Sequence, residues 1–284
     1  SALTLAYRLA NIQINDEVVV TPLTCMATNQ PLDNLGAKLK FVDVNYQTGN
    51  VDTDDLKKKV TKNTKCISLV HWAGQPFEIK EVKKISRKYN IPIIEDAAHS
   101  FGASYEGKLI GNHGNFCIFS FQAIKHLTTG DGGILVCPNK KIAQRARKLR
   151  WYGLNRNFRG NKWKQDILES GYKFHMNDIN ATIGLVQFSR IHKLLEARKK
   201  LADYYNKLRE AEGNKDYIAM LVRFFMPSVI MLQETNSKPN PEIVRPQQLV
   251  RDYASMIRDL RYLGYVLTIT FTYAGVFAFI SGSA

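Results

Sequence analysis

The stretch Phe119-Ser120-Phe121-Gln122-Ala123-Ile124-Lys125-His126-Leu127-Thr128-Thr129-Gly130-Asp131-Gly132-Gly133 decides which fold class we expect for this chain. It begins as the end of an apolar, strand-like run and closes in a glycine-rich turn, with a single lysine, Lys125, between the two. Ser120, a small hydroxyl residue, lies five positions before that lysine. A lysine in such a loop can act as a nucleophile when its surroundings lower the pKa of its ammonium group.

An acidic residue follows a second apolar run upstream. Ile91-Pro92-Ile93-Ile94 leads into Glu95-Asp96-Ala97-Ala98-His99-Ser100-Phe101-Gly102. A lysine amine and a carboxylate are what pyridoxal 5'-phosphate (PLP) chemistry requires of a protein. The amine forms a Schiff base with the cofactor aldehyde, and the acid keeps the pyridine nitrogen protonated so that the ring accepts electrons. We therefore predict PLP as the cofactor and Lys125 and Asp96 as catalytic residues.

Strand-like and helix-like runs alternate from residue 15 to about 137. Helices are clearest at 54–60 and 79–89, and strands are expected at 17–21, 39–44, 66–71, 91–95, 115–121 and 133–137. This alternation favours an α/β fold with a mostly parallel sheet flanked by helices. Ligands of such sheets collect at the carboxyl ends of the strands, where we expect His71, Asp96 and Ser120.

Composition places the chain among ordinary globular proteins. It has 284 residues, of which 45% are hydrophobic and 23% are charged. The four cysteines are widely spaced and form no CxxC motif, which favours reduced thiols in a cytoplasmic protein over a metal site or a disulfide framework. They are Cys25, Cys66, Cys117 and Cys137. The chain opens as a helix and shows no signal-peptide pattern, so we expect it to begin inside a domain.

The formal net charge of +15 is concentrated between Lys140 and Lys164, a stretch without acidic residues. We interpret this stretch as a solvated helix face followed by a polar loop. The more specific alternative is that this basic stretch attracts a small anionic substrate, such as a nucleotide diphosphate. Nucleic acid ranks third, because no recognised binding motif accompanies the charge, and we predict no nucleic-acid partner.

Six blocks of residues 1–212, taken in order, resemble the DegT/DnrJ/EryC1/StrS family of PLP-dependent sugar aminotransferases. Two are the lysine and acidic stretches quoted above. The others are Asp16-Glu17-Val18-Val19-Val20-Thr21-Pro22, Phe41-Val42-Asp43-Val44 with Thr48-Gly49-Asn50, His71-Trp72-Ala73-Gly74-Gln75-Pro76 and Gly171-Tyr172-Lys173-Phe174-His175-Met176-Asn177-Asp178-Ile179-Asn180-Ala181. The resemblance implies the large domain of fold type I, truncated at its N-terminus. It also implies a cytoplasmic homodimer that moves an amino group from glutamate to a keto group of a nucleotide-linked sugar.

The resemblance assigns roles to individual residues. Lys125 would bond the cofactor, and Asp96 would pair with its pyridine nitrogen. His99 would hydrogen-bond the phenolic oxygen of the cofactor, and Ser120 would donate to its phosphate. Family members with histidine in place of the lysine are dehydratases, so Lys125 favours amino transfer.

Other positions depart from the family pattern. A Gly-Thr pair that contacts the phosphate would stand just before Ser1, which could keep one such contact. Cys25 stands where the family usually stacks an aromatic ring on the cofactor, and cysteine offers far less area. Lys173 stands where a partner subunit reaches the phosphate, and lysine suits that role. His71 and Gln75 are expected to shape the pocket.

A helical stretch from about 177 to 209 follows, with apolar residues at helical spacing, including Ile179, Ile183 and Val186. The family pattern stops after Gly213, so we predict two parts, 1–212 and an unrelated hydrophobic helical tail, 213–284. Residues 263–284 carry no charge, which suits a membrane-spanning helix, although a buried hairpin or helix of a soluble domain is the alternative.

The tail from about residue 220 also resembles a fragment of a Bcr/CflA-type drug transporter of the major facilitator class. The resemblance rests on Leu232-Gln233-Glu234-Thr235, Arg251-Asp252-Tyr253, Tyr262-Leu263-Gly264-Tyr265 and Phe277-Ala278-Phe279-Ile280-Ser281-Gly282-Ser283. It implies a junction of two unrelated fragments near 213–220. Two alternatives to an aminotransferase therefore remain open: a membrane transporter remnant and a non-catalytic chimeric fragment.

Overall fold

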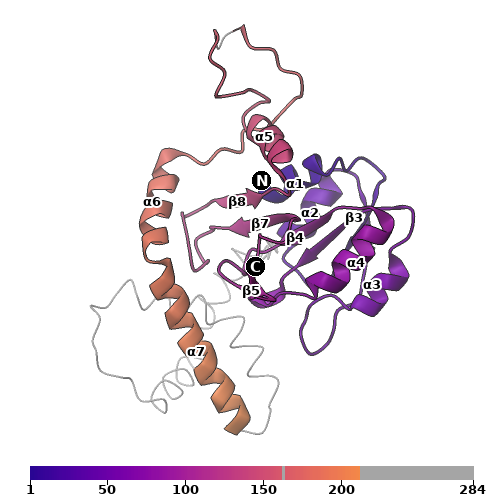
Figure 1. Ribbon diagram of the computed structural model, residues 1–284, viewed down its shortest axis with the longest axis vertical. Coiled ribbons are helices and arrows are strands. Elements are labelled where there is room, and N and C mark those ends of the chain that lie inside the picture. Colours follow the sequence, from indigo (N-terminus) through magenta and orange to yellow (C-terminus); the bar gives the residue numbers. More distant parts are fainter. Residues whose placement is uncertain (162–163, 212–284) are drawn as a thin grey trace, which may run out of the picture. The chain divides into compact units, whose positions relative to one another are not determined.

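A computed structural model describes residues 1–161 and 164–211. Its centre is a six-stranded sheet of order β2-β1-β3-β4-β7-β8 (Figure 1). The strands are β1 (Glu17–Val20), β2 (Lys38–Phe41), β3 (Thr64–Val70), β4 (Ile93–Asp96), β7 (Phe116–Ser120) and β8 (Gly133–Val136). All neighbouring pairs are parallel except β7 and β8. The prediction of a mostly parallel α/β sheet is confirmed, with strands at the six expected places.

Helices cover both faces of this sheet. One face packs against α1 (Ala2–Leu9), α2 (Met26–Asn34) and α5 (Lys140–Leu149), and the other packs against α3 (Thr53–Lys59) and α4 (Ile79–Tyr89). Side chains of a strand alternate between faces. Accordingly Val18 and Val20 join the α1 side, whereas Val19 joins the α4 side, and all three are fully buried. The apolar strand runs of the sequence thus reflect burial on both faces.

Helix ends follow local side-chain chemistry. The Asp52 carboxylate accepts from the backbone N–H groups of Asp54 and Asp55 and so caps α3. The Asn139 side chain caps α5 in the same way, by accepting from the N–H of Ile142. The helix expected in the basic stretch from Lys140 is therefore present, and the helices predicted at 54–60 and 79–89 correspond to α3 and α4.

Two short elements lie outside these expectations. The 3-10 turn η1 (Trp72–Gly74) follows β3, and the hairpin strands β5 (Ser104–Tyr105) and β6 (Lys108–Leu109) form a separate two-stranded sheet. Strands of two residues are too short to show the alternation from which a strand is recognised in sequence.

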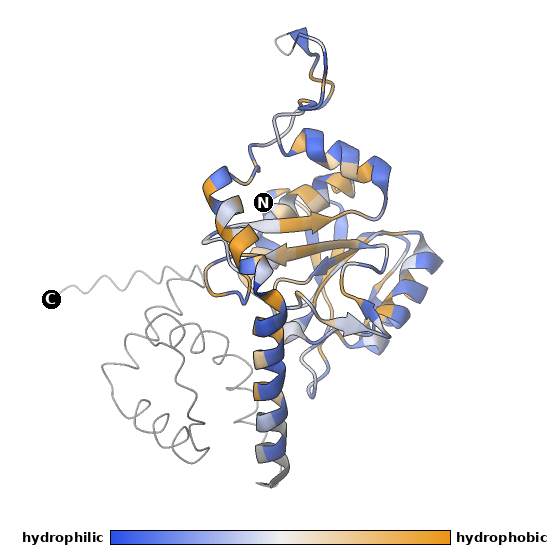
Figure 2. Ribbon diagram, turned by 60° about the vertical axis from the view of Figure 1, so that its left-hand side comes forward, coloured by the Kyte–Doolittle hydropathy of each residue, from blue (hydrophilic) through white to orange (hydrophobic). Residues whose placement is uncertain are grey.

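The helical stretch predicted at about 177–209 is present, but it is not one continuous helix. The structure has α6 (Asp178–Ser189) and α7 (Ile191–Ala211), separated at Arg190. The Arg190 N–H bonds to the Gln187 carbonyl, a tighter turn than in an α-helix, and apolar spacing alone does not reveal such a break. Figure 2 shows α7 as largely hydrophilic, whereas α6 carries several hydrophobic residues.

Within the described ranges, no helix is both long and apolar enough to cross a membrane. The segment 263–284 and the transporter-like residues from about 220 lie outside the described residues. The proposed boundary at 213 and the two alternatives based on that tail therefore stay predictions.

Candidate functional site

The site lies at the carboxyl ends of β3, β4 and β7, which are neighbours in the sheet. His71 directly follows β3, Asp96 ends β4 and Ser120 ends β7. The parallel register pairs Val70 with Asp96 and Asp96 with Ile118, so these three ends lie side by side. The topology therefore gathers residues that are far apart in sequence, as expected for this class of sheet.

Asp96 is a buried carboxylate with hydrogen bonds to both oxygens. Its Oδ2 accepts from the Thr28 hydroxyl at 2.6 Å, and its Oδ1 accepts from the Ala98 N–H at 3.1 Å. Burial raises the pKa of Asp96, and these two hydrogen bonds and the positive charge of Lys125 act in the opposite direction. Because both oxygens accept, the contacts suit the ionised form.

Lys125 lies in the loop between β7 and β8. The Lys125 N–H bonds to the Gln122 carbonyl, and the Thr129 N–H bonds to the Phe121 carbonyl, both at 2.9 Å, so the backbone folds back on the end of β7. Burial lowers the pKa of the Lys125 amine, opposed by the charges of Asp96 and Cys25. A partly buried amine with a lowered pKa releases its proton more readily and can then act as a nucleophile.

His99 follows β4 by three residues, and part of its side chain is exposed to solvent. Burial nevertheless lowers the pKa of its ring to about 4, with further contributions from Lys125 and His126. Both observations hold for a side chain that lines a recess, where protein atoms surround the ring but one side stays open. The turn after β3 approaches the backbone here, because a Cβ at Gly74 would lie 2.8 Å from the His99 carbonyl oxygen.

Cys25 and Ser120 also lie in this region. Cys25 precedes α2, is exposed, and interacts electrostatically with Lys125. The Ser120 hydroxyl oxygen accepts from the Gln122 N–H at 3.3 Å. Among the described residues the Ser120 proton has no acceptor, so it is available to a ligand.

Ser1 and Lys173 are placed differently. Ser1 precedes α1, whose residue Ala2 lies beside Gly133, the register partner of Ser120. The start of the chain is thus close to the end of β7. Lys173 is exposed and pairs through its backbone with Trp151; no contact in the described part of the chain joins its side chain to Lys125 or Asp96. The resemblance assigns this lysine to the site of a partner subunit.

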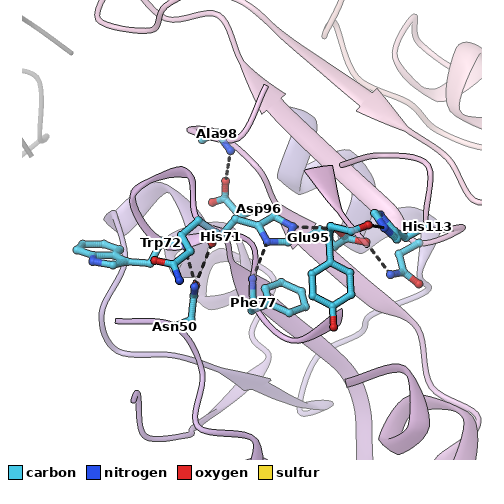
Figure 3. A network of polar contacts seen from close by, with 11 residues as sticks. Asn50, His71, Trp72, Phe77, Glu95, Asp96, Ala98 and His113 are labelled. Atoms are coloured by element: carbon cyan, nitrogen blue, oxygen red, sulfur yellow. Dashed lines mark hydrogen bonds and ion pairs between the residues drawn. The ribbon is translucent and has the colours of Figure 1, made fainter. Parts of the chain in front are cut away.

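His71 and Glu95 form a buried pair behind the site (Figure 3). Both side chains are at most 1% exposed, and His71 Nε2 lies 2.8 Å from Glu95 Oε2. His71 Nδ1 accepts from the Phe77 N–H, so the ring proton is on Nε2 and is donated to Glu95. The other Glu95 oxygen accepts from Asn115 at 2.6 Å. Because its side chain is fully buried, His71 supports the site from behind instead of lining it.

Gln75 contributes through its backbone. The Asn50 amide donates to the Gln75 carbonyl oxygen at 3.0 Å and accepts from the Trp72 N–H at 2.9 Å. Asn50 therefore fixes the turn after β3, as Figure 3 shows for its contact with Trp72. Sequence reasoning missed Thr28 and Glu95, since only the folded chain brings them to Asp96 and His71.

A buried carboxylate and a deprotonatable lysine at the carboxyl edge of a mostly parallel sheet define a class of cofactor-dependent α/β enzymes. The comparisons make the class specific: the model of the DegT/DnrJ/EryC1/StrS aminotransferase family matches residues 1–241. The chain belongs to this family, and the match extends past the predicted boundary at 213.

Three similar proteins illustrate the relationship. An uncharacterized protein of Methanocaldococcus jannaschii is 40% identical over 202 residues, which is 69% of this chain and 52% of that protein. A UDP-4-amino-4,6-dideoxy-N-acetyl-beta-L-altrosamine transaminase of Campylobacter jejuni is 33% identical, covering 80% of this chain and 60% of the transaminase. The crystal structure of a sugar aminotransferase from Micromonospora echinospora is 36% identical with a TM-score of 0.70, covering 75% of this chain and 59% of the other. The chain thus spans about half the length of the curated relatives it matches.

Aminotransferases of this family are PLP-dependent, and the residues present fit that cofactor. Lys125 would offer an amine of lowered pKa to the aldehyde, and Asp96 would offer a hydrogen-bonded carboxylate to the ring nitrogen. Ser120 would offer a hydroxyl proton to the phosphate. Cys25 would give little surface for stacking, so the ring contact of the family pattern would be weaker here.

Proposed function

We propose that this chain carries the large-domain chemistry of a PLP-dependent sugar aminotransferase. The single observation that supports it best is the placement of the Lys125 loop, at the carboxyl end of β7, beside the doubly hydrogen-bonded carboxylate of Asp96 at the end of the neighbouring strand β4. Asp96 comes from strand β4 and Lys125 from the loop after β7, and the two would serve opposite ends of one cofactor ring. When bound, PLP supplies the electron sink for carbanion formation at the substrate carbon.

The residues of the chain would share the remaining work. Asp96 would hold the ring nitrogen in its protonated form, and Ser120 would hold the phosphate. His99, neutral near pH 7 because the pKa of its ring is about 4, would hydrogen-bond the phenolic oxygen. Lys125 Nζ would hold the cofactor at rest and, once released, take up and return the proton of the substrate carbon.

The substrates we propose are glutamate as the amino donor and a nucleotide-linked keto sugar as the acceptor. The transaminase of Campylobacter jejuni is named for a UDP-linked amino sugar, and so is a Shewanella sediminis relative named UDP-4-amino-4-deoxy-L-arabinose–oxoglutarate aminotransferase, 37% identical over 203 residues. We further propose that the protein acts in the cytoplasm as a homodimer with sites at the interface, to which Ser1 and Lys173 contribute phosphate contacts.

Reductive labelling tests the proposal. Purified chain incubated with PLP is treated with borohydride, digested and mapped by mass spectrometry. We expect one stable pyridoxyl group on Lys125, none on that peptide in Lys125→Ala, and full labelling in Lys58→Ala, which removes an exposed lysine of α3 as a matched control. An unlabelled Lys125, or equal labelling of many lysines, would contradict the assignment. Transfer of 15N from glutamate to nucleotide-linked keto sugars then tests the substrates.

A further inference from the structure

Thr28 contacts Asp96 from a helix that the sequence motifs do not include. The Thr28 hydroxyl donates to Asp96 Oδ2 at 2.6 Å across 68 residues of sequence, and both residues are at most 4% exposed. Thr28 lies in the first turn of α2, which follows β1, the neighbour of β3 in the sheet. Of the predicted site residues, only Cys25 is next to α2, the helix from which this short hydrogen bond reaches Asp96.

The direction of the hydrogen bonds around Thr28 follows from counting protons. A threonine hydroxyl has one proton, and Thr28 gives it to Asp96, so Thr24 Oγ1, 2.7 Å away, is the donor to Thr28 Oγ1. The Tyr7 hydroxyl likewise gives its proton to the Thr28 carbonyl at 2.9 Å, so the Ser68 hydroxyl donates to Tyr7 at 2.8 Å. Thr28 is therefore fixed through both its side chain and its backbone.

Charge around Asp96 is sparse. Four titratable groups interact electrostatically with it: Lys125, His71, Tyr7 and Cys117. Only Lys125 is a cation, and burial favours its neutral form. Since desolvation opposes the ionised carboxylate, hydrogen-bond donors must supply much of its stabilisation, and a donor to an ionised group is roughly twice as strong as one between neutral groups.

We propose that Thr28 is a positioning residue, whose hydroxyl, oriented by Thr24, keeps Asp96 ionised and its Oδ2 fixed for a protonated ring nitrogen. The proposal rests on the PLP function argued above. It assigns a role in cofactor binding to a side chain that need not touch the cofactor. The Ala98 N–H, the second donor to Asp96, is a backbone group, which leaves Thr28 as the side-chain donor that substitution can remove.

The test uses the full chain and three variants of it, each with a single substitution. Thr28→Val keeps the shape and removes the donor, Thr28→Ser restores the donor, and Thr24→Val removes only the group that orients it. Thr64→Val is a matched control, because Thr64 is also 2% exposed and donates at 2.6 Å to a carboxylate, that of Glu17, at the opposite end of the sheet. Asp96 is followed without cofactor by the 13C shift of labelled aspartate carboxyls over pH, with Asp96→Asn for assignment.

We expect Thr28→Val to raise the titration midpoint of Asp96 and to weaken PLP binding about tenfold or more, as the loss of a hydrogen bond to a charged group predicts. Thr28→Ser should restore both, Thr24→Val should shift the midpoint in the same direction by less, and Thr64→Val should leave it unchanged. An unchanged midpoint in folded Thr28→Val would overturn the proposal. If Thr28→Val does not fold, an unchanged midpoint in Thr24→Val decides against it. Failure of Lys125 labelling would refute the PLP function and leave this titration result standing.

Discussion

The fold shields the two ionisable residues at the centre of the site, Asp96 and Lys125, from water. Burial raises the pKa of Asp96 and lowers that of Lys125, so desolvation opposes both charges. For Asp96 the folded chain binds a proton more tightly than the unfolded chain. This tighter proton binding stabilises the folded chain below the pKa that Asp96 has in the unfolded chain. The stabilisation is lost as pH rises through the higher pKa of Asp96 in the folded chain. Hydrogen bonds from Thr28 and Ala98 offset part of the free energy that it costs to ionise the buried Asp96 carboxyl group.

His99 gives a pH prediction at this scale. Because burial and the charges of Lys125 and His126 lower its pKa to about 4, the His99 ring should stay neutral from pH 8 to pH 5 and titrate only below. Two-dimensional NMR of the ring protons, assigned with His99→Gln, measures this. In Lys125→Met the midpoint should rise, since a neighbouring positive charge is lost. A midpoint near 6.5 in the unsubstituted chain would contradict the burial that the structure gives this ring.

Among the elements, helix ends carry the most readable local signals. Helix α4 ends at Asn90, whose φ of 52° and ψ of 47° place it in the left-handed region. A Cβ costs energy in that region, and asparagine tolerates it better than most residues. The same helix presents Ile79, Val82 and Ile85 to the core at helical spacing.

Substitution of Asn90 tests this cap. Asn90→Ala should lower the free energy of unfolding by about 1 kcal/mol, whereas Asn90→Gly should leave it equal or slightly higher. Urea denaturation followed by circular dichroism measures both. Asn34→Ala, at the exposed and right-handed end of α2, should have a smaller effect and controls for loss of an amide. A cost for Asn90→Gly as large as that for Asn90→Ala would show that side-chain contacts dominate over backbone conformation.

Much of this element level could be predicted from the chain alone, because buried parallel strands such as β3 and β4 read as apolar runs. Lys125 and Asp96 were predicted as site residues through their motifs. Thr28, Tyr7 and Glu95 were not, since their partners lie 20 to 68 residues away and only topology joins them. The break at Arg190 was missed because apolar spacing continues across it.

For the molecule as a whole, the apolar surface of α6 is the main unexplained feature. Periodic apolar residues usually face a core, yet several here are exposed: Ile179 (75%), Ile183 (40%), Leu185 (73%), Val186 (58%) and Phe188 (56%). Surfaces of this kind commonly mark protein–protein contacts. Together with the proposed function, they favour a homodimer that covers α6.

Sedimentation velocity of the full chain tests this at micromolar concentration. We expect a dimer, and we expect Leu185→Glu combined with Val186→Glu to produce a monomer, because two charges would enter an apolar contact. Leu168→Glu is the control, since Leu168 is 90% exposed and lies in the loop before α6. A monomeric unsubstituted chain, or dissociation by Leu168→Glu alone, would argue against α6 as the contact.

Strand β4 carries two adjacent acidic residues whose carboxylates have different partners. Glu95 forms hydrogen bonds with His71 and Asn115, whereas Asp96 forms one with Thr28. Since consecutive side chains point to opposite faces, loss or gain of one residue upstream in this strand would exchange the two carboxylates. Neighbouring side chains can repack around a conservative replacement within β4, but they cannot compensate for the insertion or deletion of one residue in this strand. The spacing of this strand is therefore under as strict a constraint as the identity of its last residue.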